Sequence, residues 1–165
     1  MLFGKNYFYF ILFLIISLFL GCAGIIDTDR DLQVKDKLSR ITANSPTSHI
    51  ELLFYDKFNQ IIQNSTKAAD YKLDYSLIVS NTQTLTIEEN SSNLKHTVVT
   101  VDFKLLYRGK IIHKGKINTE ATSGAVSSLY SQGQSSKFAR ERLAILLAQR
   151  VYQNLYLYFL ENLNK

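Results

Sequence analysis

Three consecutive segments with alternating apolar and polar residues constrain the fold of this chain most. They cover residues 71–79, 99–107 and 111–121. Alternation with period two is typical of strands that have one face on a core and the other in solvent. A polar connection follows the first segment, and Arg108-Gly109 forms a tight-turn pair after the second. The three segments are therefore expected to form an antiparallel meander.

Apolar residues recur at spacings of three and four in two further segments, which predicts two helices. The first is expected at residues 48–64, where Thr47 or Ser48 can cap the first turn. The second is expected at residues 137–163 and carries two neighbouring apolar stripes. A helix that is apolar over such a wide arc needs cover on more than one side.

A short strand expected at residues 38–42 completes the element order β-α-β-β-β-α. This order predicts an α+β fold in which two helices pack on one face of a mainly antiparallel four-stranded sheet. The expected organisation is a lipoprotein signal peptide at residues 1–21, a linker with the short strand at residues 22–46, and a single α+β domain at residues 47–165. The length of this domain suffices for one hydrophobic core.

The chain begins with a leader of the kind that directs export. An uncharged apolar run at residues 7–20 follows a single lysine, Lys5. The run is shorter than the ~20 residues that a membrane-spanning helix needs, which favours an export signal over a structural helix. Residues 19–22, Phe-Leu-Gly-Cys, resemble a bacterial lipobox, in which the cysteine is acylated and the chain is cut before it. Cys22 would then anchor the protein to the cell envelope by lipid.

Two alternatives for the leader stay open. The apolar stretch can be extended through Ile26, which is just long enough for an uncleaved membrane anchor. Cys22, the only cysteine, can also be an ordinary buried thiol. In either case no second cysteine is present to form a disulfide, so stability must come from packing.

Charge and motif content argue against several classes of function. The 19 Lys and Arg residues against 14 Asp and Glu residues give a mild excess of +5. This excess, without a nucleic-acid-binding motif, suits phosphorylated lipid or an acidic membrane surface better than nucleic acid. His49, His96 and His113 lack a repeated metal-ligand spacing, so neither a metal nor a cofactor is expected. No catalytic residue is expected either, and a periplasmic hydrolase with an unrecognised site is the enzymatic alternative.

Cationic residues follow the outward positions of the meander. Period two places several lysines opposite the apolar set, and one arginine lies at the adjoining turn: Lys72, Lys104, Lys110, Lys114, Lys116 and Arg108. Such a surface can bind phosphorylated lipid through charge-assisted hydrogen bonds. Lysine on exposed strands also prevents edge-to-edge pairing, which is the alternative explanation.

The layout as a whole resembles a known family. The lipobox, the helix, the three-stranded meander, Leu129-Tyr130 and the alanine-containing segment at residues 138–148 together are similar to the lipopolysaccharide-assembly lipoprotein family LptE. The resemblance covers nearly the whole chain. It implies a lipid-anchored protein on the periplasmic side of the outer membrane of Gram-negative bacteria. Members plug the β-barrel LptD, help it assemble and bind lipopolysaccharide on its way to the cell surface.

The resemblance also implies functional residues. In the family, basic residues near the tip of the first hairpin and near the start of the last helix contact lipopolysaccharide, whereas here the tip carries Glu88 and Glu89. The candidate lipopolysaccharide-binding residues are Lys72, Lys95, Lys104, Arg108, Lys114, Lys116 and Lys137. The second stripe of the last helix implies barrel-facing residues Tyr152, Tyr156 and Phe159, which can equally belong to the core. An envelope lipoprotein that acts as a lipid carrier or adaptor without a barrel is the alternative function.

Overall fold

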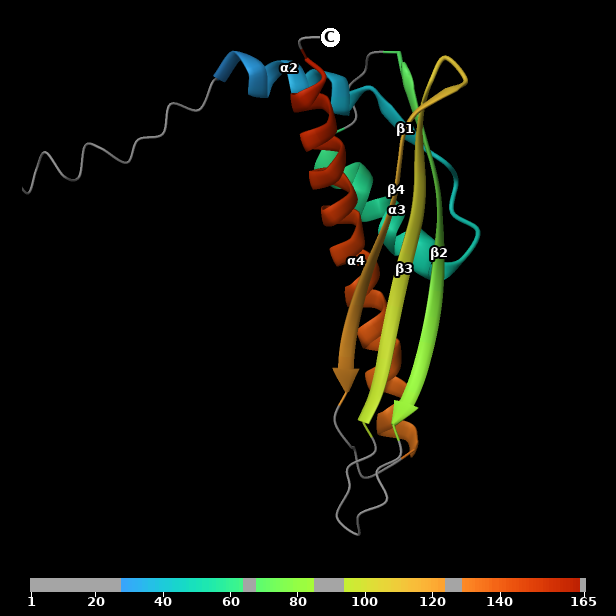
Figure 1. The fold of residues 1–165 in the computed structure, drawn as a ribbon. Helices are drawn as coiled ribbons and strands as arrows, with labels where there is room; N and C mark the ends of the chain where they lie inside the picture. Colours follow the sequence, from blue (N-terminus) through green and yellow to red (C-terminus); the bar gives the residue numbers. More distant parts are fainter. Residues whose placement is uncertain (1–27, 64–67, 85–93, 124–128, 164–165) are drawn as a thin grey trace, which may run out of the picture.

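The computed structural model describes residues 28–63, 68–84, 94–123 and 129–163. Along this part of the chain the elements are α2 (Thr28–Ser39), β1 (Ile41–Ala43), α3 (His49–Ile62), β2 (Tyr71–Thr84), β3 (Leu94–Tyr107), β4 (Lys110–Ser123) and α4 (Leu129–Glu161) (Figure 1). The predicted α+β class is confirmed. Cys22, the signal peptide and the acidic hairpin tip lie outside the described residues.

The four strands form one mixed sheet in the order β1-β2-β3-β4. β2, β3 and β4 pair antiparallel, as the alternation predicted, whereas β1 pairs parallel with the start of β2. Two residues, Arg108 and Gly109, connect β3 to β4 and have φ values of 49° and 78°. Positive φ at both positions is typical of the type I′ turn, whose twist matches that of the flanking strands. The predicted tight turn is therefore confirmed.

The core lies between one face of the sheet and the helices. α3 contributes Phe54 and Phe58, whose rings stack with centroids 6.0 Å apart, and β3 contributes Phe103. α4 contributes residues at helical spacing, among them Leu147, Val151 and Leu155. Burying apolar area at roughly 25 cal/mol per Å² is the main source of stability in such a core. The long α4 runs beside the sheet over most of its length (Figure 1).

The start of α3 is fixed by a network of capping hydrogen bonds. Ser48 is the N-cap residue, with extended backbone, and its Oγ accepts a hydrogen bond from the backbone N–H of Glu51 at 3.2 Å. The Glu51 carboxylate in turn accepts from the backbone N–H of Thr47 at 2.8 Å and from its hydroxyl at 2.6 Å. The first bond satisfies an N–H group that the helix itself leaves unpaired, and the other two tie Thr47 to the first turn. Of the two predicted caps, Ser48 is therefore the one used.

Helix α2 was not predicted. It lies in the segment that was expected to be a linker, residues 22–46, and buries Val34 and Leu38 completely against the other helices. Because Leu38 lies in the last turn of α2, the first strand begins at Ile41 instead of Leu38. α4 also begins earlier than predicted, at Leu129 instead of Lys137. Serine, glycine and glutamine in its first turns gave that stretch the composition of a loop.

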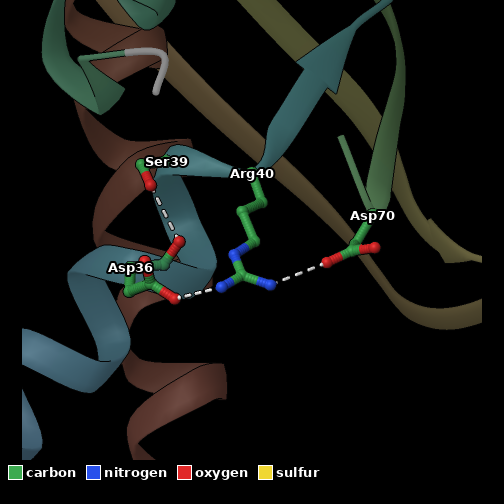
Figure 2. Close-up of polar contacts among 4 residues, drawn as sticks. All are labelled: Asp36, Ser39, Arg40 and Asp70. Carbon is green, nitrogen blue, oxygen red and sulfur yellow. Dashed lines mark hydrogen bonds and ion pairs between the residues drawn. The ribbon is translucent and has the colours of Figure 1, made fainter. Parts of the chain in front are cut away.

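Arg40 holds α2 and the sheet together at the point where they meet. Its guanidinium forms ion pairs with Asp36 at 2.8 Å and with Asp70 at 3.0 Å (Figure 2). The Ser39 hydroxyl donates a hydrogen bond to the Asp36 carbonyl oxygen at 2.8 Å. The Arg40 carbonyl oxygen accepts from the backbone N–H groups of Asp70 and Tyr71. These contacts fix the start of β2, and with it the position of the first lysine on the outer face of the sheet.

Candidate functional site

The face of the sheet that points away from the helices carries a cluster of exposed lysines, which we call the lysine face: Lys72, Lys104, Lys114 and Lys116. Strand pairing brings Asp74, Lys104 and Lys114 into one row across β2, β3 and β4. The next row contains Ser76, Asp102 and Lys116. These two rows line a shallow hollow of about 580 Å³.

Two lysines of this face are neutralised within the chain. Lys72 lies 3.2 Å from Asp74, and Lys116 lies 3.6 Å from Asp102. All four side chains are substantially exposed to solvent, so each pair contributes little to stability, in the range of about 0–1 kcal/mol. The pairs do remove two positive charges from the surface that an anion would meet.

Lys104 and Lys114 differ from the other two lysines. They are directly opposite each other in the β3–β4 ladder, and within the described part of the chain neither forms an ion pair. Opposed positions in an antiparallel pair place the Cα atoms about 5 Å apart, and like charges on directly opposed side chains are unfavourable. A bound anion would offset this repulsion. Two adjacent ammonium groups match a phosphate in charge, since lysine binds phosphate as a point charge.

Arg108 adjoins the lysine face at the β3–β4 turn. Its guanidinium lies 5.1 Å from the centroid of the Tyr107 ring, in a cation–π contact. Arg108 and Lys72 line a second hollow of about 390 Å³ together with Asp70 and Leu106. The cationic surface thus continues from the lysine face around this end of the sheet.

Lys95 and Lys137 lie far from the lysine face. Lys95 is nine residues before Lys104 in β3, a separation of about 30 Å at ~3.3 Å per residue. In the ladder, residue 95 pairs with Ser123 at the end of β4. Lys137 is exposed near the start of α4, which lies at that same end of the molecule. The seven predicted cations therefore divide into a group of five and two distant residues.

Helix α2 explains the second apolar side of α4. The Tyr156 hydroxyl donates to Asp31 of α2 at 3.0 Å, and Asp31 also forms an ion pair with Lys35 at 2.7 Å. Tyr152 is half-buried next to the same helix. Phe159 is only 3% exposed and packs edge-on against Tyr71, with ring centroids 5.1 Å apart. The expectation that Phe159 faces a partner is therefore wrong, and α2 covers much of the two tyrosines.

A different part of α4 exposes apolar side chains. Phe138, Ile145 and Leu146 are 58%, 36% and 37% exposed, and we call them the apolar patch. With Arg142 and the end of β4 around Thr122, the patch lines a hollow of about 630 Å³. Contiguous exposed apolar side chains are candidates for an interaction surface. The sequence analysis expected two apolar stripes on this helix but did not single out this surface.

The three histidines lie in separate places. His49 is 3.4 Å from Glu141, His96 is hydrogen-bonded to Thr122, and His113 is hydrogen-bonded to Asn154 at 2.7 Å. Among the described residues, no group of three or more His, Cys, Asp or Glu side chains is placed to hold a metal ion. The described part of the chain also contains no helix that has both the length and the apolarity required to cross a membrane.

Comparisons with known proteins identify a shared fold. No known protein family and no curated protein matches the sequence. A protein from Caulobacter crescentus CB15 described as a lipoprotein is 20% identical, with a TM-score of 0.61 over 78% of this chain and 96% of that chain. Rare lipoprotein B from Shewanella oneidensis is 15% identical, with a TM-score of 0.58 over 76% and 97%.

A minor lipoprotein from Acinetobacter baumannii has the same fold as well. It is 13% identical, with a TM-score of 0.53 over 72% of this chain and 89% of that chain. The alignments cover nearly the whole length of all three structures, so the similarity concerns the complete domain. The chain therefore has the fold of three solved bacterial lipoproteins.

Proposed function

We propose that this chain is a lipoprotein of the outer membrane, anchored through Cys22, that plugs and helps assemble an LptD-like β-barrel and assists the delivery of lipopolysaccharide. The fold shared with three lipoproteins supports the anchor, because it agrees with a lipobox found independently in the sequence. The proposed role is binding and not catalysis. Apolar surface docks against the barrel, while lysines hold the phosphate groups of the lipid.

The observation that carries the ligand part of this proposal is the opposed pair Lys104 and Lys114. Neither lysine forms an ion pair within the described part of the chain, although Asp74 is the cross-strand neighbour of Lys104, whereas Lys72 and Lys116 have carboxylate partners. Lipid A carries phosphate groups, which match two adjacent ammonium groups in charge. The exposed, shallow shape of the hollow suits a headgroup that rests on the surface while its acyl chains stay elsewhere.

The packing of the core favours a plug over a lipid carrier. A carrier needs an apolar cavity between the sheet and the helices. Here that space holds closely packed, fully buried side chains, among them Phe54, Phe58, Leu105 and Leu155. The apolar patch on α4 lies on the outside of the domain, where it is accessible to the wall of a surrounding barrel.

Binding of lipopolysaccharide tests the ligand site. The double variant Lys104→Ala/Lys114→Ala should weaken binding of purified lipopolysaccharide at least about tenfold, which corresponds to ~1.4 kcal/mol. The control Lys57→Ala/Lys110→Ala removes the same charge at positions away from the lysine face and should leave binding unchanged. Equal affinity of the two double variants would show that only net charge matters and would contradict the site.

Co-purification with the barrel tests the docking surface. Phe138→Asp places a charge in the apolar patch and should reduce recovery of a one-to-one complex with the LptD-like barrel from gently solubilised membranes. Leu157→Asp is the matched control, because Leu157 is 55% exposed on the same helix but lies outside the patch. Isolation of the unmodified protein without a barrel would refute the plug.

Mass spectrometry of the same material should find an acylated Cys22 at the N-terminus, and an unmodified thiol would refute the anchor.

A further inference from the structure

The outer face of the sheet carries two apolar side chains at the end where β3 turns into β4. Leu106 pairs with Ile111 across the ladder at this end, and we call these two residues the tip pair. Ile111 is 56% exposed, and the half-buried Leu106 lines the hollow of about 390 Å³ beside the turn. The tip pair therefore presents apolar surface to whatever lies beyond this end of the sheet.

Positive charges surround the tip pair. Lys72 is its neighbour on β2, and the next row of the outer face holds Lys104 and Lys114. Arg108 is exposed at the turn itself, with its guanidinium over the Tyr107 ring. Apolar side chains bordered by tyrosine and basic residues are typical of surfaces that lie between the headgroups and the acyl chains of a membrane, and the basic residues favour anionic lipid.

Helix α2 packs at the same end of the molecule as the turn (Figure 1). The Lys37 ammonium group of α2 lies 5.9 Å from the centroid of the Phe159 ring, and this ring packs edge-on against Tyr71. Tyr71 in turn contacts Tyr107, the residue before the turn, with ring centroids 5.2 Å apart. Three consecutive contacts therefore connect α2 to the turn.

The distance of α2 from Cys22 brings this end to the membrane, a step that rests on the proposed acylation of Cys22. Six residue steps separate Cys22 from Thr28, where α2 begins, and a chain of that length spans at most roughly 20 Å. β3 has 14 residues and extends over roughly 46 Å. The reach of the anchor is less than half of this length, so an acylated Cys22 keeps the end with α2 and the turn close to the lipid surface.

We propose that this end of the domain docks on a bilayer that contains anionic phospholipid, with Ile111 inserted between the lipids and Arg108 at their phosphate groups. A lipid surface fits this end better than a protein partner, because the anchor brings lipid to it and the basic residues complement anionic headgroups in charge. The apolar patch near the start of α4 lies toward the opposite end of the molecule, so docking on lipid leaves it accessible to the barrel (Figure 1).

An environment-sensitive label tests the docking. The acylated protein with Ile111→Cys, labelled with an NBD fluorophore, is incorporated into vesicles of phosphatidylethanolamine and phosphatidylglycerol. The emission should shift to shorter wavelength and should be quenched by phospholipids that are brominated in their acyl chains. The matched control is Ile78→Cys, because Ile78 is equally exposed, at 56%, on the same face of the sheet. Ile78 pairs with Thr100, roughly 20 Å along β3 from the tip pair, so its label should stay in water.

Removal of the charge at the turn tests the preference for anionic lipid. Arg108→Asn keeps the turn, because asparagine tolerates the positive φ of 49° at this position. With the native arginine, the label at residue 111 should shift further in vesicles with phosphatidylglycerol than in vesicles of phosphatidylcholine alone. In Arg108→Asn this difference should become smaller, and an unchanged difference would contradict the contact between Arg108 and the phosphate groups.

Mass spectrometry of the labelled protein separates the possible failures. An acylated Cys22 together with a label at residue 111 that stays in water overturns the docking and leaves the anchor and the barrel complex standing. A protein without acyl groups overturns the anchor, and the docking with it. A label that leaves water only when the LptD-like barrel is added assigns this end to the barrel and also overturns the proposal.

Discussion

The contact between Gly115 and Phe103 makes the substitution Gly115→Ala a sensitive test of the packing. The two residues are direct neighbours across β3 and β4, and the Phe103 ring lies over the glycine. A Cβ atom at position 115 would lie 2.5 Å from Cζ and 2.7 Å from Cε1 of this ring. Real Cβ atoms do not approach so closely, so the ring must move. Since Phe103 is only 2% exposed, its movement displaces other core residues.

Two opposing effects determine how much Gly115→Ala changes the free energy of unfolding. Replacing glycine within a strand by alanine stabilises by roughly 0.5–1 kcal/mol, because the unfolded chain loses conformational freedom. Overpacking by one methyl group in a dense core costs about 1–3 kcal/mol. We expect the second effect to dominate, with a net loss of about 1 kcal/mol. For a domain of this size, this corresponds to a decrease in Tm of roughly 3–5 °C.

Thermal unfolding followed by circular dichroism measures this loss. Gly133→Ala is the control, because position 133 in α4 has no atom within 4 Å of the added Cβ, and alanine should there stabilise the helix by up to ~1 kcal/mol. In a Phe103→Leu background the smaller side chain leaves room, so Gly115→Ala should cost at least about 1 kcal/mol less than in the native background. An unchanged or higher Tm for Gly115→Ala alone would refute the close contact.

Three further predictions concern the caps and the cover of α4. Ser48→Ala removes the N-cap of α3 and should lower the free energy of unfolding by about 1 kcal/mol in a urea titration. Burial raises the pKa of Glu51, but hydrogen bonds from Thr47, Leu77 and Ser48 outweigh it and hold the pKa below its usual 4.5. The ionised carboxylate therefore stabilises the fold above pH 4.5, and this contribution disappears as the pH falls through the lowered pKa. Near pH 6 the Tm of Glu51→Gln should lie below that of the native protein. In acid the two Tm values should become equal, as Tm measurements across this pH range can show. Tyr156→Phe removes the hydrogen bond to Asp31 and should cost about 0.5–1 kcal/mol in the same urea titration, whereas Tyr152→Phe should cost less.

The sheet and the two larger helices could be predicted because the spacing of apolar residues typical of each continues over many residues. Helix α2 could not, since half of its residues are charged and only Val34 and Leu38 reach the core fully. Two apolar residues four positions apart are too few to distinguish a helix from a linker. The error extended to the candidate site. Without α2, the second stripe of α4 had no visible cover, so a partner-facing role for Phe159 stayed open beside the core position that the structure shows.

The lysine face depends on a detail that alternation alone does not determine. A regular ladder from the Arg108-Gly109 turn would place Lys104 opposite His113, and Lys114 would then point toward the helices. The structure has an extra residue, Ile112, because Leu106 pairs with Ile111 while Leu105 pairs with His113. This bulge moves every later residue of β4 to the other face.

The consequences of the bulge differ on its two sides. After it, Lys114 and Lys116 join Lys104 on the outer face, as the sequence analysis expected. Before it, Lys110 pairs with Tyr107, whose row includes the core-facing Tyr71, so the expectation that Lys110 belongs to the outer face is wrong. The alternation within β4 grouped Lys114 and Lys116 correctly but added Lys110 to them, because alternation alone does not reveal a bulge. Only the register of the ladder could show which face each lysine occupies, and the register is set by one bulged residue whose carbonyl oxygen accepts a hydrogen bond from Tyr158 of α4. The position of the proposed phosphate site therefore depends on this bulge, at which α4 contacts the edge of the sheet.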